Sequence, residues 1–104
     1  MTNKQKKKFG YVAPYSVRKE AREGLECLRK GSKAGTRVGR YRATQLSKGS
    51  NLSLRTIKRI KRFARHEKNK SYSGDPCKDR GYVAWKLWGG DSGKEWVNEI
   101  LKKK

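Results

Sequence analysis

The segment of residues 53–68 combines a helical apolar stripe with an almost uninterrupted basic remainder. Five apolar residues recur there at steps of three and four or directly adjacent: Leu54, Ile57, Ile60, Phe63 and Ala64. This spacing is typical of one face of an α-helix, and Ser53 stands before it as a favourable N-cap. No acidic residue interrupts the other positions before Glu67. Such a stripe can be buried only by packing on other helices, so the segment predicts a helical core with a cationic outer surface.

The overall charge restricts what such a core can contain. The chain of 104 residues has 29 Lys and Arg against 9 acidic residues, a formal charge of +20, and only 33% of its residues are hydrophobic. This length allows one small domain. Because self-repulsion of this size opposes compaction, the composition favours a polyanionic partner, and nucleic acid is the first choice.

The charge and the aromatic residues lie in different parts of the chain. Residues 1–70 hold 22 basic and 4 acidic residues, whereas residues 71–104 hold 7 and 5. Five aromatic side chains gather in the second part: Tyr72, Tyr82, Trp85, Trp88 and Trp96. Aromatic residues bury large areas, so we expect the last third to build the core and the first two thirds to face the polyanion.

Apolar spacing predicts further helices on both sides of the basic one. The first begins after an N-cap at Ser16 and buries Val17, Ala21, Leu25 and Leu28; its acids, Glu20, Glu23 and Glu26, are expected in surface ion pairs. A second begins after Thr36 and carries Val38, Tyr41, Ala43 and Leu46. A fourth covers residues 81–88, and a fifth begins at a cap on Asp91. The sequence therefore predicts an all-α fold, a compact bundle of four or five short helices.

The expected domain covers residues 15–101. Residues 1–14 and 102–104 are rich in Lys, and we expect them to be disordered basic tails.

The order of helix, glycine-containing turn and capped basic helix from residue 39 to residue 70 is that of a helix-turn-helix. The turn of residues 48–52 is longer than the tight turn of that motif, so a generic helical hairpin remains an alternative. In either case phosphates would be contacted by basic residues of the two helices: Arg55, Lys58, Arg59, Arg62, Arg65, Arg40, Arg42 and Lys68.

Other chemistry finds little support in the sequence. Cys27, Cys77 and the single His66 do not supply four ligands at zinc spacing, so no metal or other cofactor is expected. Two unpaired thiols are the favoured state of the cysteines, with one disulfide as the alternative. No apolar stretch is long enough to span a membrane.

Asp75, Asp79 and Asp91 are the only carboxylates that could hold a metal for a nuclease, and two of them fall in an expected loop, so we expect no enzyme.

Several motifs together resemble a known family. The pattern includes Arg42-Ala43, Leu46, Gly49, Leu52-Ser53, Thr56-Ile57, Arg59, Phe63, Arg65-His66-Glu67 and the stretch Gly81-Tyr82-Val83-Ala84-Trp85-Lys86-Leu87-Trp88-Gly89-Gly90-Asp91 with Gly93 and Trp96. It is similar to a small uncharacterised domain of tailed phages and large DNA viruses, with the resemblance running from about Ser16 to Ile100. The resemblance implies a viral origin but no catalytic or binding residues. Relatives tend to have Met where this chain has Ile60, a swap that conserves volume.

These observations favour a phage- or virus-encoded protein without enzymatic activity that binds nucleic acid, with double-stranded DNA preferred over RNA. It would act in the host cytoplasm or nucleoid, in the nucleus of a eukaryotic host, or inside the virion. The alternative is a virion-internal or head-assembly component, or an inhibitor of a host protein, that works through protein–protein contacts anchored by Trp88 or Trp96.

Overall fold

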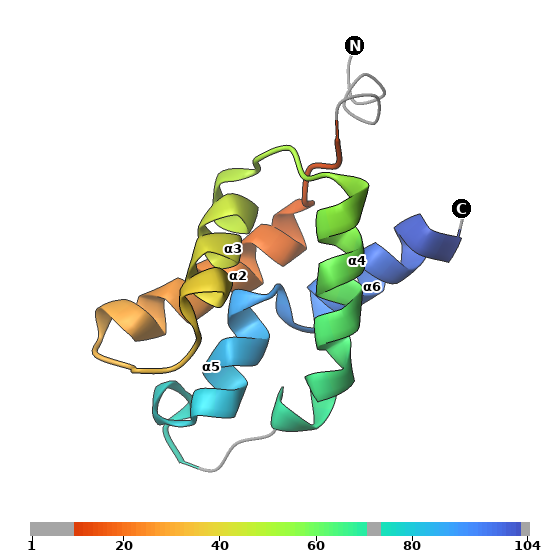
Figure 1. The fold of residues 1–104 in the computed structure, drawn as a ribbon. Helices are drawn as coiled ribbons and strands as arrows, with labels where there is room; N and C mark the ends of the chain where they lie inside the picture. The colour runs from red at the N-terminus through yellow and green to blue at the C-terminus, as the bar shows by residue number, and fades with distance from the viewer. Residues whose placement is uncertain (1–9, 71–73, 103–104) are drawn as a thin grey trace.

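The computed structural model describes residues 10–70 and 74–102, with side chains described for residues 10–67 and 74–102. Five α-helices and two 3₁₀ segments follow one another: α2 (Tyr15–Arg29), α3 (Arg37–Lys48), α4 (Leu54–Phe63), η1 (Ala64–Lys70), η2 (Pro76–Lys78), α5 (Arg80–Leu87) and α6 (Gly90–Lys102) (Figure 1). Within this described part there is no β-strand, and no helix is long and apolar enough to cross a membrane. The predicted all-α bundle is confirmed.

Helix α2 is the centre of the packing, since it lies against α3, α5 and α6. Val17 and Ala21 are fully buried as the stripe predicts, whereas Leu25 and Leu28 are only partly buried. The start of the helix differs from the prediction. Pro14 occupies the N-cap position and no side chain caps the helix, so Ser16 is not the cap. The Pro14 carbonyl accepts hydrogen bonds from the Val17 and Arg18 N–H groups, both at 3.1 Å, so the helix is already formed at Ser16.

The caps of the two basic helices agree with the sequence. Thr36 Oγ1 accepts a hydrogen bond from the Gly39 N–H at 3.0 Å, and Ser53 Oγ accepts one from the Thr56 N–H at 3.2 Å. Gly49 ends α3 with a φ of 71°, a left-handed conformation that glycine adopts without strain. The turn then runs from Gly49 to Ser53, because α4 begins only at Leu54.

Helices α3 and α4 pack on different partners. Helix α3 lies against α2 and α5, whereas α4 lies against α6 and η1 (Figure 1). The two are therefore consecutive helices with a long turn rather than a tightly packed pair, which is closer to the generic alternative than to a compact helix-turn-helix.

The folded part begins before residue 15. The backbone of Tyr11 and that of Leu52 exchange two hydrogen bonds of 2.8 Å, forming an isolated bridge that holds the α3–α4 turn. Ala13 is also buried. Residues 11–13 of the expected N-terminal tail thus contact the helical part, and Lys102 of the expected C-terminal tail ends α6. The structure describes nothing of residues 1–9 or 103–104, so the rest of the expected tails lies outside the described residues.

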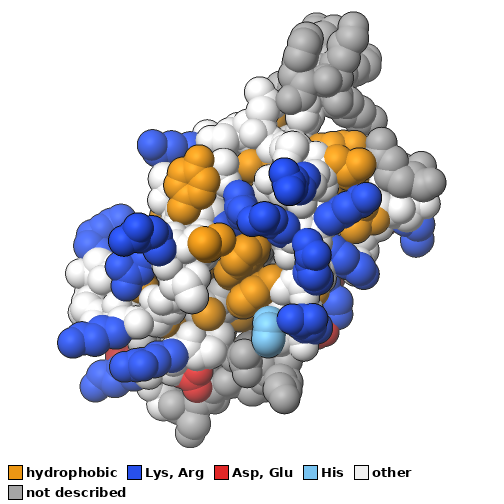
Figure 2. Space-filling view, in the orientation of Figure 1, with side chains coloured by type: hydrophobic (Ala, Val, Ile, Leu, Met, Phe, Trp, Pro, Cys, Tyr) orange, Lys and Arg blue, Asp and Glu red, His pale blue; other side chains and the backbone are white. Residues whose placement is uncertain are grey.

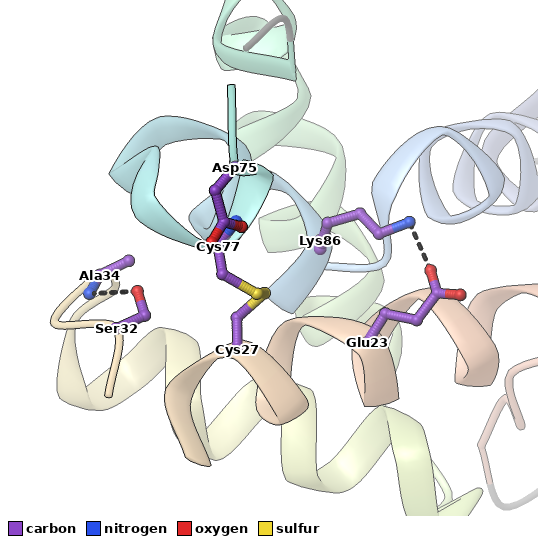
Figure 3. Close-up of a disulfide and its surroundings, with 7 residues drawn as sticks. All are labelled: Glu23, Cys27, Ser32, Ala34, Asp75, Cys77 and Lys86. Atoms are coloured by element: carbon purple, nitrogen blue, oxygen red, sulfur yellow. Dashed lines mark hydrogen bonds and ion pairs between the residues drawn. A yellow bond between two sulfur atoms is a disulfide. The ribbon is translucent and has the colours of Figure 1, made fainter. Parts of the chain in front are cut away.

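The cysteines are joined, which corrects the expectation of two unpaired thiols. Cys27 on α2 and Cys77 in η2 form a disulfide across a sequence separation of 50 residues (Figure 3). Sequence spacing could not decide this pairing, because it depends on η2 being folded back onto the end of α2.

The close approach of α2 and α5 generates a first prediction. A Cβ added at Gly24 would lie 2.9 Å from the backbone nitrogen of Leu87, so the two helix backbones would have to separate. We expect Gly24→Ala to lower the free energy of unfolding by about 2 kcal/mol, although alanine is the better helix former. Gly39→Ala, where the nearest atom is a side-chain nitrogen, should cost less. Urea unfolding measures both, and equal stability of Gly24→Ala and the parent would contradict the packing.

The disulfide generates a second prediction. Cross-linking residues 50 apart restricts the unfolded chain, and the loop-entropy relation gives about 4 kcal/mol. We expect dithiothreitol to lower the midpoint of thermal unfolding of the parent protein and to leave that of Cys27→Ser/Cys77→Ser unchanged. A midpoint in the parent that does not respond to reduction would contradict this contribution.

Candidate nucleic-acid interface

The outer side of α4 carries a row of exposed cations. Ile57 and Ile60 are buried, and this fixes which side of the helix faces the core. The remaining predicted residues of this helix and of the start of η1 are all exposed: Arg55, Lys58, Arg59, Arg62 and Arg65. We call these five residues the α4 row. None of them has an ion pair with a carboxylate in the described part of the chain.

The acids of the basic two thirds are used elsewhere. Glu23 pairs with Lys19 and Glu26 with Arg29, as expected for surface pairs along α2. Glu67 pairs with Lys94 of α6. Glu20 departs from the expectation, because it pairs with Lys86 of α5. Consequently, among the described residues, no carboxylate forms an ion pair with the α4 row.

Lys86 links α5 to the acids of α2. Its Nζ lies 2.9 Å from Glu20 Oε1 and 2.7 Å from Glu23 Oε1, the second contact being visible in Figure 3. Burial of Lys86 disfavours its charged form, but the hydrogen bonds with Glu23 and Glu20 outweigh burial and raise the pKa of Lys86 above its usual value. Glu20 also accepts a hydrogen bond from the Ser92 N–H at 3.0 Å. The ion pairs of Lys86 thus connect α2 with α5, and the hydrogen bond from Ser92 connects α2 with α6.

Of the two predicted arginines on α3, only Arg40 is available to a partner. Arg40 is exposed, whereas Arg42 is only 6% exposed and is therefore not a surface contact, which corrects the prediction. Arg42 donates to Gln45 Oε1, and its guanidinium carbon lies 5.5 Å from the centre of the Trp88 ring. Its buried Nε has no hydrogen-bond partner among the described residues. Burial and, secondly, the charge of Arg59 lower the pKa of Arg42.

Two further basic residues, Lys68 and Lys61, are not part of the α4 row. Lys68 lies in η1, but its side chain is outside the described residues. Lys61 is not part of the α4 row, because its Nζ donates to Asn98 Oδ1 of α6.

Trp88 contacts both α3 and α4, which sequence reasoning missed. Its ring stacks on Phe63 of α4, with centroids 4.7 Å apart and planes at 10°. On the α3 side it lies below the Arg42 guanidinium, and a Cβ at Gly39 would be 3.2 Å from its Nε1. The signal was present only as an aromatic residue before Gly89-Gly90, and its partners lie 25 to 49 residues away in the sequence.

Apolar side chains of α3 reach the surface beside these cations. The sequence placed Val38 and Tyr41 with the apolar positions of their helix, but Val38 is 48% and Tyr41 61% exposed. Figure 2 shows hydrophobic side chains in the middle of this face, with Lys and Arg side chains on either side. A partner on this face therefore meets both apolar and cationic groups.

The three candidate metal carboxylates have structural contacts. Asp75 Oδ1 accepts from the Cys77 N–H, Asp79 Oδ1 accepts from the Tyr82 N–H and caps α5, and Asp91 Oδ1 accepts from Trp85 Nε1. Among the residues that the structure describes, no group of three or more His, Cys, Asp or Glu side chains could hold a metal ion.

The buried guanidinium of Arg42 generates a prediction about stability. Methionine keeps the length and the apolar contact with Trp88 but removes a charge that faces Arg59. We expect Arg42→Met to leave the free energy of unfolding unchanged or to raise it by about 1 kcal/mol. Arg42→Ala also leaves a cavity and should lower it by about 2 kcal/mol. Equal losses in the two variants, measured by urea unfolding, would show that the guanidinium itself stabilises the fold.

Comparisons with protein-family models, with curated proteins and with solved structures find no match to this chain. The resemblance to the domain of phages and large DNA viruses therefore stays a prediction, as does the viral origin that it implies.

Proposed function

We propose that this protein binds nucleic acid, double-stranded DNA in preference to RNA, through the α4 row together with Arg40. The observation that carries the proposal is that these six cations are exposed and have no ion pair with a carboxylate in the described part of the chain. Each phosphate contacted by Lys or Arg releases condensed counterions, which supplies affinity without regard to sequence.

The shape of the row favours a duplex. From Arg55 to Arg65 a helical rise gives about 15 Å, and the major groove of DNA admits an α-helix. Arginine can donate two hydrogen bonds to a guanine edge, whereas lysine acts as a point charge on phosphate. Four of the five residues in the row are arginines. The row thus has side chains suited to both base edges and phosphates, and no catalytic residue or cofactor is part of the proposal.

The viral setting belongs to the same proposal. A small basic protein of a phage or large DNA virus would meet its own genome in the host cell or in the virion, as the resemblance implies. The Lys-rich residues 1–8 would add contacts to phosphates that do not depend on sequence.

A protein partner is the second candidate, and the exposed Val38 and Tyr41 beside Arg40 favour it. Tyrosine and arginine are enriched among the residues that dominate the binding energy of protein interfaces. A virion component or a host protein with an acidic surface would fit this face. Trp88 and Trp96, suggested by the sequence as anchors, are instead partly buried against the core.

Salt dependence with a charge-matched pair of variants tests the proposal. Arg59→Ala/Arg62→Ala removes two charges from the α4 row, and Lys19→Ala/Arg29→Ala removes two charges that are already paired with glutamates on α2. With six phosphate contacts, the affinity of the parent for duplex DNA should fall about 10³-fold between 50 and 200 mM salt. The α4 variant should have a log–log salt slope shallower by about 2, and the α2 variant should keep the parent's slope.

Fluorescence anisotropy with labelled duplex DNA, single-stranded DNA and RNA of mixed sequence measures these quantities. Equal losses in the two variants would show that only net charge matters and would contradict a defined interface. Weak binding to all three polymers, with no effect of the α4 variant, would favour the protein partner.

A further inference from the structure

A second cationic site lies away from the α4 row, over the disulfide. It is a cavity of about 330 Å³ whose walls come from the turn after α2, from η2 and from the first residue of α5. Its lining includes Lys30, Lys33, Lys78 and Arg80 together with both cysteines. In Figure 3 the turn that carries Ser32 and the segment that carries Asp75 face each other beside the sulfur atoms. In Figure 1 this region lies at the lower left, whereas α4 lies at the right.

The charges of this cavity are unbalanced. Among the residues that the structure describes, four cations line it, and Asp75 is the single carboxylate. Asp75 Oδ1 already accepts the Cys77 N–H at 3.0 Å. Within the described residues none of the four cations has an ion pair. A concave site lined by charges of one sign focuses the electrostatic field and raises the local concentration of anions.

We propose that this disulfide-based pocket binds a phosphate group, carried either by a free nucleotide or by the backbone of a nucleic acid. Its volume is at the lower end of small-molecule sites, about 300 to 1,000 Å³, which suits a phosphate or diphosphate with part of its sugar. Lysine supplies point charges and Arg80 supplies a planar fork that can hold two phosphate oxygens. The proposal stands whether or not the α4 row binds DNA.

The disulfide is what keeps the two walls together. Lys30 and Lys33 follow Cys27 on one wall, whereas Lys78 and Arg80 follow Cys77 on the other. The like charges of the two walls repel each other, and the covalent bond between Cys27 and Cys77 opposes that repulsion. The proposal therefore includes a dependence of phosphate binding on the oxidised state of the cysteines.

Titration of the ¹⁵N-labelled protein with inorganic pyrophosphate, followed by NMR at constant ionic strength, tests the pocket. We expect saturable shifts of the amides of residues 31–33 and 77–80. Lys33→Ala/Arg80→Ala, which changes two exposed side chains, should weaken binding at least about tenfold, since each lost charged hydrogen bond costs more than that factor. Arg59→Ala/Arg62→Ala removes the same charge and should leave pyrophosphate binding unchanged.

Redox dependence is measured in the same titration with dithiothreitol, an uncharged reductant, and with Cys27→Ser/Cys77→Ser. Both should weaken binding about tenfold while the amides of α3 and α4 keep their positions. Adding duplex DNA or ADP separates the two sources: displacement of pyrophosphate by the duplex identifies backbone phosphate, and tighter binding of ADP than of pyrophosphate identifies a nucleotide.

Three results would overturn the proposal: shifts that do not saturate, an affinity that Lys33→Ala/Arg80→Ala leaves unchanged, or equal losses in that variant and in the α4 variant. Loss of DNA binding in the α4 variant with pyrophosphate binding intact would leave this site standing, so the two functions fail separately.

Discussion

The positive charge of residues 1–70 cannot be neutralised within the chain, and the rest of the structure is arranged around that imbalance. Their four acids, Glu20, Glu23, Glu26 and Glu67, face 22 basic residues. All four have cationic partners that lie outside the α4 row. The outer sides of α3 and α4 therefore keep their charge, whereas the ion pairs lie along α2, between α2 and α5, and between η1 and α6. In this bundle the unpaired cations on the outer sides of α3 and α4 repel one another, whereas the ion pairs elsewhere are attractive.

Close packing contacts around α5 oppose this repulsion between cations. Leu87 is fully buried and lies where a side chain at Gly24 would have to be, so α2 and α5 approach to the limit of backbone contact. Trp88, one residue later, carries the packing to both basic helices through Phe63 and Arg42. Because α3 and α4 pack on different helices, this indole is a side chain that contacts both of them. The last third of the chain, which is rich in aromatic residues, thus contacts both basic helices through Trp88.

The local features of this fold could be predicted from the sequence, and the long-range ones could not. The stripe that contains Ile57 and Ile60, with its cap at Ser53, depends only on neighbours within two turns, so helix α4 and the exposure of its cations followed directly. The burial of Arg42 could not be predicted, because it depends on Trp88, which lies 46 residues further along the chain. The cysteine pairing likewise required the path of the chain between residues 27 and 77. Sequence spacing therefore located the α4 row but not the pocket over the disulfide.

The two cationic sites differ in what fixes the spacing of their charged side chains. In the α4 row the helix backbone fixes the spacing of the arginines, so the row persists while α4 is folded, and its open, extended form suits a long polyanion. In the pocket the cations belong to segments that are distant in the sequence, and only tertiary contacts and the Cys27–Cys77 bond hold them at close range. We expect a change in redox state to act directly on the second arrangement only, because no cysteine lies in α3 or α4. The two proposals thus assign to one chain a constant surface for an extended polymer and a concave site whose affinity for a compact phosphate depends on oxidation.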